Sequence, residues 1–135
     1  MCILWILSRG LKFERSQIAI SRKKMIALLA DTPRKMTAGL MFMKSLKQNE
    51  CMLFVFPRDG AHPIWMRNMK FSIDILWLDG KKKVVDMVES AKPIHGFDIS
   101  SYSSNHPSRY VVELNAGFVR KNKVKIGDTT HFALT

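Results

Sequence analysis

The sequence predicts an α+β fold that is mainly β: an antiparallel, barrel-like sheet of six or seven strands with one main helix (about 33–46) and one short helix (about 116–122). Three observations predict this fold. Short apolar or alternating segments, the pattern of strands, recur along most of the 135 residues. Turn signals separate these segments, and only one long segment carries apolar residues at helical spacing. Strands joined mostly by hairpins and closed by a helix are typical of small barrel-like domains.

The first predicted strand of this domain spans residues 25–30, where an unbroken apolar run indicates a strand buried on both faces. Asp31 and Thr32 follow as candidate N-caps, and Pro33 suits the first helical position because it has no N–H to satisfy. The main helix is therefore expected to begin at residue 33.

The main helix is expected to continue to residue 46, because Met36, Leu40 and Met43 fall at i, i+4 and i+7 and form one apolar stripe. Gly39 then lies in the middle of the helix, where glycine costs about 1 kcal/mol relative to alanine. A close backbone contact at this position would explain the cost.

The middle of the chain is predicted to be sheet. Residues 51–56 are apolar and aromatic, as in a strand, and residues 62–68 resemble a short edge strand. Residues 73–78 and 83–89 are expected to form a hairpin around Asp79-Gly80, because a type I′ turn requires positive φ and this dipeptide tolerates it.

The last third begins with a long loop over residues 90–108, which is rich in serine, proline and glycine. Residues 109–114 alternate and are expected to form a strand with one apolar and one mostly polar face. Asn115 is the expected N-cap of the short helix, and residues 130–134 complete the sheet.

The charge is strongly basic and unevenly distributed. The net charge is +11, and residues 1–24 alone carry six Lys or Arg against one Glu. We therefore divide the chain into a basic N-terminal extension (1–24), which is either poorly ordered or an extra strand, and a single domain (25–135). A basic surface attracts polyanions such as nucleic acids without sequence preference, although the same charge also serves solubility.

Two cysteines, Cys2 and Cys51, are too few for a disulfide scaffold, so a reducing cytoplasm is the expected location. The longest apolar run, residues 2–7, lacks the basic flank of a secretory signal and is shorter than the roughly 20 residues of a membrane span. We expect no metal, because the four histidines and Cys51 show no ligand spacing, and no other cofactor. No serine lies in a nucleophile-elbow motif.

Several separated blocks of the sequence resemble one known family in order and spacing. They are Ala30-Asp31-Thr32-Pro33, Gly39-Leu40-Met41-Phe42, Met52-Leu53-Phe54-Val55-Phe56, Trp65-Met66-Arg67-Asn68, Asp74-Ile75, residues 109–118 and Gly127-Asp128. Over about residues 25–134 the chain resembles the DUF192 family of small bacterial and archaeal proteins of unknown function. The resemblance implies a compact, mostly β, barrel-like domain and no established activity. Cys51 and Met69 depart from the glycine and threonine usual in the family.

The first candidate site is Trp65, Arg67 and Asn68, together with Asp74. Alternation places Trp65 and Arg67 on one face of the short strand, with Asn68 on the other. A large ring, a guanidinium and an amide can stack on and hydrogen-bond a flat or sugar-like ligand. The alternative is that Trp65 belongs to the core and Asn68 closes a turn.

The second candidate set is Arg109 and Glu113, on one face of the predicted strand 109–114. Glu113 is expected to pair with Arg109 as a structural ion pair. Alternatively, Glu113 and Asp74 form a carboxylate pair for acid–base catalysis, which requires both groups in one cleft.

We interpret the protein as a small binding module for a polar small molecule or a peptide. The ligand would occupy a concave face of the sheet lined by Trp65, Arg67, Asn68, Asp74, Arg109 and Glu113. One alternative is a hydrolase-like enzyme that uses Asp74 and Glu113. The other is weak, non-specific polyanion binding through residues 1–24 and 81–83.

Overall fold

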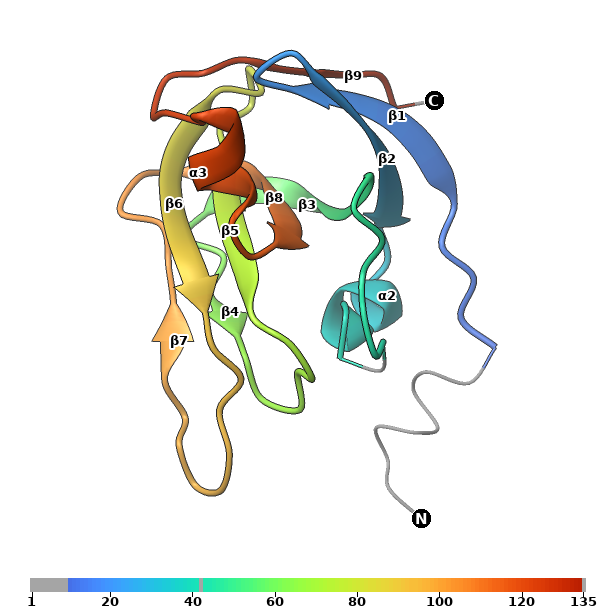
Figure 1. The fold of residues 1–135 in the computed structure, drawn as a ribbon, viewed down its shortest axis with the longest axis vertical. Coiled ribbons are helices and arrows are strands. Elements are labelled where there is room, and N and C mark those ends of the chain that lie inside the picture. Colours follow the sequence, from blue (N-terminus) through green and yellow to red (C-terminus); the bar gives the residue numbers. More distant parts are fainter. Residues whose placement is uncertain (1–9, 42, 135) are drawn as a thin grey trace.

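The computed structural model describes residues 10–41 and 43–134, and it confirms the predicted mainly β, α+β class. A curled seven-stranded sheet forms most of the molecule, with two short helices packed against it (Figure 1). The elements are β1 (Arg15–Ile20), β2 (Lys23–Ala30), α2 (Pro33–Ala38), β3 (Glu50–Gly60), β4 (Ile64–Trp65), β5 (Ile73–Leu78), β6 (Val84–Ala91), β7 (Ser101–Tyr102), β8 (Ser108–Asn115), α3 (Phe118–Asn122) and β9 (Thr130–Phe132).

The order of strands across the large sheet is β6-β5-β8-β3-β2-β1-β9, and β4 pairs with β7 in a separate two-stranded sheet. All neighbouring pairs in the large sheet are antiparallel except β2 and β3, which run parallel across the connection that contains α2. A single bridge between Lys83 and Thr129 brings the ends of β6 and β9 together, so the sheet curls towards a barrel. β1 lies within the predicted basic N-terminal extension (1–24), and it pairs with both β2 and β9.

The sheet has a hydrophobic core on each face. One core, here the α3-side core, packs α3 against residues such as Leu53, Leu76 and Val112. The other, the α2-side core, packs Leu40, at the end of the α2 segment, against residues such as Trp77. Every residue of β5 is buried, because its alternate side chains enter opposite cores. This explains why residues 73–78 lack a polar alternation.

The main helix is shorter than predicted and ends at Ala38 instead of residue 46. Thr32 caps it as expected by accepting a hydrogen bond from the Lys35 N–H (3.2 Å). Gly39 is the C-cap, with a φ of +48° and a ψ of −136° that a side chain strongly disfavours. Its predicted close contact also exists, because an added Cβ would lie 3.3 Å from the Phe54 ring.

Two local predictions are wrong: the type of turn in one hairpin and the N-cap of the short helix. The 73–78/83–89 hairpin forms, but its positive φ falls on Lys82, and Asp79 closes a longer turn by accepting hydrogen bonds from the N–H groups of Lys81 and Lys83. Asn115 does not cap α3, whose N-cap is Gly117. The Asn115 amide instead donates to the carbonyl oxygens of Leu46 and Lys47, and so joins β8 to the chain entering β3.

Gly39→Ala tests the strain at the end of α2. We expect the free energy of unfolding to fall by about 1–3 kcal/mol, because alanine must adopt an unfavourable backbone conformation against Phe54. Gly80→Ala is the matched control, since Gly80 has no positive φ and an added Cβ would meet nothing within 4 Å. Urea unfolding measures both, and equal losses would contradict the assignment.

Candidate functional site

A pocket of about 620 Å³ lies on the α2 side of the large sheet. Its walls come from α2 and the residues after it, from β3 and from β4 with the turn that follows, while one residue of β8 also lines it. Most lining side chains are apolar. Four of the six predicted site residues also line it: Trp65, Arg67, Asn68 and Glu113.

Glu113 is the polar group buried in this pocket. It lies opposite Met52 on β3 and Ile75 on β5, so its side chain faces the α2 side of the sheet. The residue is only 5% exposed, and its Oε2 atom has no hydrogen-bond partner among the described residues. Burial raises the pKa of Glu113 from 4.5 to about 8. At neutral pH the carboxyl group therefore holds its proton and can donate a hydrogen bond.

Trp65, Arg67 and Asn68 also line the pocket and are more accessible than Glu113. The Trp65 side chain is 46% exposed, and the Arg67 guanidinium carbon lies 5.3 Å from the centre of its ring, a cation–π contact. Asn68 has a φ of +62°, and its amide lies 3.9 Å from the Met41 sulfur. The pocket therefore combines an apolar wall, a buried carboxyl group and a half-buried cation stacked on an indole.

Asp74, a fifth predicted site residue, does not face this pocket. It lies opposite Leu114, so its side chain enters the α3-side core while Glu113 faces the other way. Its carboxylate accepts hydrogen bonds from the Ser90 N–H (2.8 Å) and the Val119 N–H (2.9 Å). Through these two hydrogen bonds, Asp74 connects β5 to β6 and to α3. The predicted catalytic pair of Asp74 and Glu113 is wrong, because the two carboxyl groups lie on opposite faces of the sheet.

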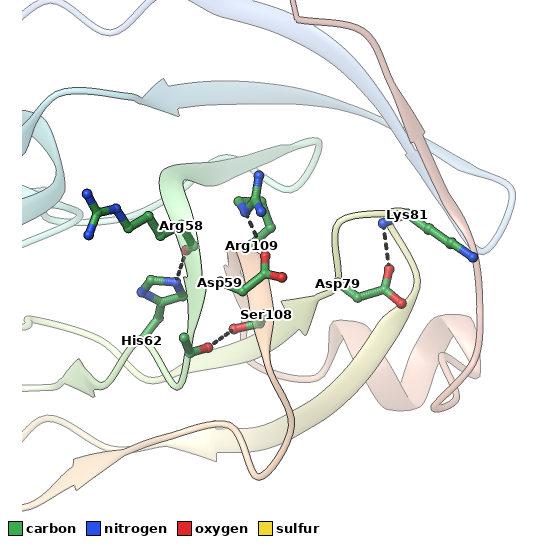
Figure 2. A network of polar contacts seen from close by, with 8 residues as sticks. Arg58, Asp59, His62, Asp79, Lys81, Ser108 and Arg109 are labelled. Atoms are coloured by element: carbon green, nitrogen blue, oxygen red, sulfur yellow. Dashed lines mark hydrogen bonds and ion pairs between the residues drawn. The ribbon is translucent and has the colours of Figure 1, made fainter.

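Arg109, the sixth predicted residue, is also outside the pocket. Its Nε donates to Asp59 at 2.7 Å, at the irregular end of β3 (Figure 2). The expected ion pair between Arg109 and Glu113 is therefore wrong. The predicted polar face of this strand is also wrong, because Val111 and Glu113 are buried on it. Arg109 instead pairs at the surface with Asp59, which sequence spacing did not connect to it.

The pocket is also lined by apolar residues that the sequence analysis did not name as site residues. Met36, Leu40, Met41 and Phe54 line it. The i, i+4 stripe on the predicted helix identified Met36 and Leu40 as inward-facing. It did not indicate a cavity, because a cavity depends on the gap left between α2 and β4.

The described residues contain no group of three or more metal-ligating side chains, and none of their helices is long and apolar enough to cross a membrane. Cys51 is buried, and burial, with Glu50 beside it, raises the pKa of its thiol to about 12. A thiol that holds its proton so firmly is a poor nucleophile and a poor metal ligand.

Comparison with known proteins agrees with the fold. The family model of DUF192, described as an uncharacterized ACR, matches residues 16–132. The chain is 32% identical over 102 residues to a UPF0127 protein of Thermococcus kodakarensis and 33% identical over 109 residues to one of Thermococcus gammatolerans. These matches cover 74% and 79% of this chain but only 60% and 66% of the two relatives.

Two crystal structures share the fold at 25% sequence identity. A Sinorhizobium meliloti protein, described as a candidate transcription regulator, superposes with a TM-score of 0.83 over 91% of this chain and 97% of its own. A protein of unknown function from Novosphingobium aromaticivorans gives a TM-score of 0.77 over 92% of this chain and 88% of its own.

Glu113→Gln tests the protonation of the buried carboxyl group. Because the folded state holds a proton that the unfolded state loses above its ordinary pKa, wild-type stability should fall as pH rises between 4.5 and about 8. The expected fall is about 1.4 kcal/mol per pH unit. The glutamine variant removes this group, so the difference between the two proteins isolates it. Urea unfolding across this pH range measures both, and parallel curves would contradict the raised pKa.

Asp74→Asn tests the structural role of the second carboxylate. The asparagine amide can accept only one of the two backbone hydrogen bonds and must bury an NH₂ group against the other. We expect a loss of about 1–3 kcal/mol in the free energy of unfolding. Amide hydrogen exchange should localise the change to the N–H groups of Ser90 and Val119. Unchanged protection at both would contradict this role.

Proposed function

The chain belongs to the DUF192 family, and we propose that it is a small binding module whose α2-side pocket holds a polar small molecule. One observation carries the proposal. Glu113 is a buried carboxyl group with an unpartnered oxygen, in a pocket that is otherwise mostly apolar. A buried polar group without a partner costs about 1–3 kcal/mol, and a ligand that hydrogen-bonds to it would recover that cost.

The charges around the pocket favour a neutral or anionic ligand over a cationic one. The whole chain carries +11, and Arg67 lines the pocket beside Trp65. With its proton retained near neutral pH, Glu113 presents an O–H donor and no negative charge. The preferred ligand therefore has an apolar body and a hydrogen-bond acceptor, a carbonyl or carboxylate, directed at Glu113. A peptide would satisfy the same requirements with a backbone carbonyl.

Binding through Glu113 is tested with a fragment library that contains matched amides, carboxylates and amines. Protein NMR identifies fragments that shift the Trp65 indole N–H signal, and titration gives their dissociation constants. We expect amides and carboxylates to bind and amines of the same shape to bind less. Predominant binding of amines would contradict the donor role of Glu113.

Three variants make this test specific. Glu113→Gln retains an N–H donor and should keep affinity within a few fold, whereas Glu113→Leu should weaken binding about 10–100-fold by removing the hydrogen bond. Glu89→Gln is the matched control, because Glu89 is an exposed carboxylate outside the pocket. If Glu113→Leu binds as tightly as the wild type, the pocket is packing space and not a ligand site.

Binding to the wild-type pocket should also depend on pH. An acceptor group binds only the protonated carboxyl group, so affinity should fall once pH exceeds about 8. Glu113→Gln should abolish that fall, because its amide donates at every pH.

We also propose that the protein is cytoplasmic, which the small number of cysteines in the sequence predicts.

A further inference from the structure

The curled sheet brings three basic segments to one end of the molecule. They are the β1–β2 turn (residues 21–24), the β5–β6 turn (residues 79–83) and the segment from α3 to the start of β9 (residues 120–128). We call this surface the basic end. Figure 1 shows both turns and α3 at the end of the sheet where β9 crosses, away from α2 and β4.

Direct contacts hold the three segments together. The Ser21 hydroxyl donates to the Asp128 carboxylate at 2.7 Å, which joins the first segment to the third. The Gly127 N–H donates to the Val84 carbonyl oxygen at 2.7 Å, and the Thr130 N–H donates to the Lys82 carbonyl oxygen at 2.9 Å. These bonds, at the borders of the second and third segments, place the two segments side by side, so all three segments lie together at this end.

The basic end carries most of the net positive charge of the chain. It contains ten Lys or Arg, and all except Lys82 have exposed side chains: Arg22, Lys23, Lys24, Lys81, Lys82, Lys83, Arg120, Lys121, Lys123 and Lys125. Its only acids are Asp79 and Asp128, so it carries +8 of the net +11. The three salt bridges within the described parts of the chain all involve other arginines and lysines.

The two acids of the basic end accept hydrogen bonds from its own segments. Asp79 accepts hydrogen bonds from two N–H groups of its own turn, and Asp128 accepts from the Lys125 N–H and the Ser21 hydroxyl. These bonds hold the pKa of Asp128 below its usual range. Lys82 is also engaged, because its ammonium lies 4.4 Å from the centre of the Phe132 ring and donates to the Phe132 carbonyl oxygen. The basic end therefore presents nine exposed Lys and Arg side chains on a hydrogen-bonded backbone.

We propose that the basic end binds the phosphate backbone of double-stranded nucleic acid without sequence preference. Lysines supply eight of the ten charges, and lysine contacts phosphate as a point charge without the planar pair of donors that arginine offers to base edges. No exposed aromatic side chain lies at the basic end, whereas proteins that hold single strands stack bases on aromatic rings. Ile126 is its only exposed large apolar residue, which is too little to insert into a membrane surface.

Salt dependence of binding tests this proposal. A mixed-sequence DNA duplex labelled with fluorescein is titrated with the full chain at several salt concentrations, and fluorescence anisotropy gives the dissociation constants. The logarithm of the association constant should fall linearly with the logarithm of the salt concentration, with a slope of about −0.9 for each phosphate contacted. A duplex of different sequence should give the same constants.

A triple variant, Lys23→Gln with Lys81→Gln and Lys121→Gln, removes one exposed charge from each segment. It should make the slope shallower by about two to three units. The matched control is Lys44→Gln with Lys70→Gln and Lys92→Gln, which removes three exposed lysines outside the basic end. The control should change the slope by less than one unit. Circular dichroism verifies that both variants fold.

Four outcomes would overturn the proposal, and the first three concern duplex binding, the variants and membranes. They are the absence of duplex binding at low salt, an equal effect of the two triple variants, and tighter binding to vesicles of phosphatidylserine and phosphatidylcholine than to the duplex. Tighter binding to single-stranded DNA would likewise contradict the duplex preference. None of these results bears on the Glu113 pocket, because that pocket is lined by α2, β3, β4 and β8 instead of the basic end.

Discussion

The structure depends on one constraint: the middle strands of the large sheet are buried on both faces. A polar side chain on such a strand must be hydrogen-bonded inside a core or must serve a ligand, because water cannot reach it. Asp74 and Glu113 are the two carboxyl groups in this situation on β5 and β8. They satisfy the constraint in opposite ways. Asp74 is fully engaged by backbone N–H groups, whereas one oxygen of Glu113 has no partner.

This difference separates a structural carboxylate from a candidate functional one. Asp74 accepts hydrogen bonds from segments far away in the sequence, so it organises β6 and α3. Glu113 makes no comparable connection, and leucine at this position would fill the same space at a lower desolvation cost. Glu113 lies opposite Met52 in a pocket that the α2 segment also lines. This position supports ligand binding as the reason for a carboxyl group there.

Periodicity predicted most of the strands and the mainly β class. It worked because the runs of apolar residues in β5 and β8 reflect burial, which is set locally by each strand. It failed where backbone conformation or distant contacts decide the result. Gly39 ends α2 through a positive φ, and Arg109 turns to Asp59, which lies fifty residues earlier in the chain. Neither effect leaves a periodic signal.

Curling explains why this small sheet can carry two separate surfaces. Closing β9 towards β6 brings the β1–β2 and β5–β6 turns to one end, and with them lysines that lie about sixty residues apart in the sequence. The charge of these lysines is screened within about 10 Å at 0.1 M salt, so it acts on a partner that touches that end. At the pocket, desolvation is the dominant influence on Glu113. The fold therefore separates the basic end, where charge dominates, from the Glu113 pocket, where burial dominates, so the two proposals can be tested independently.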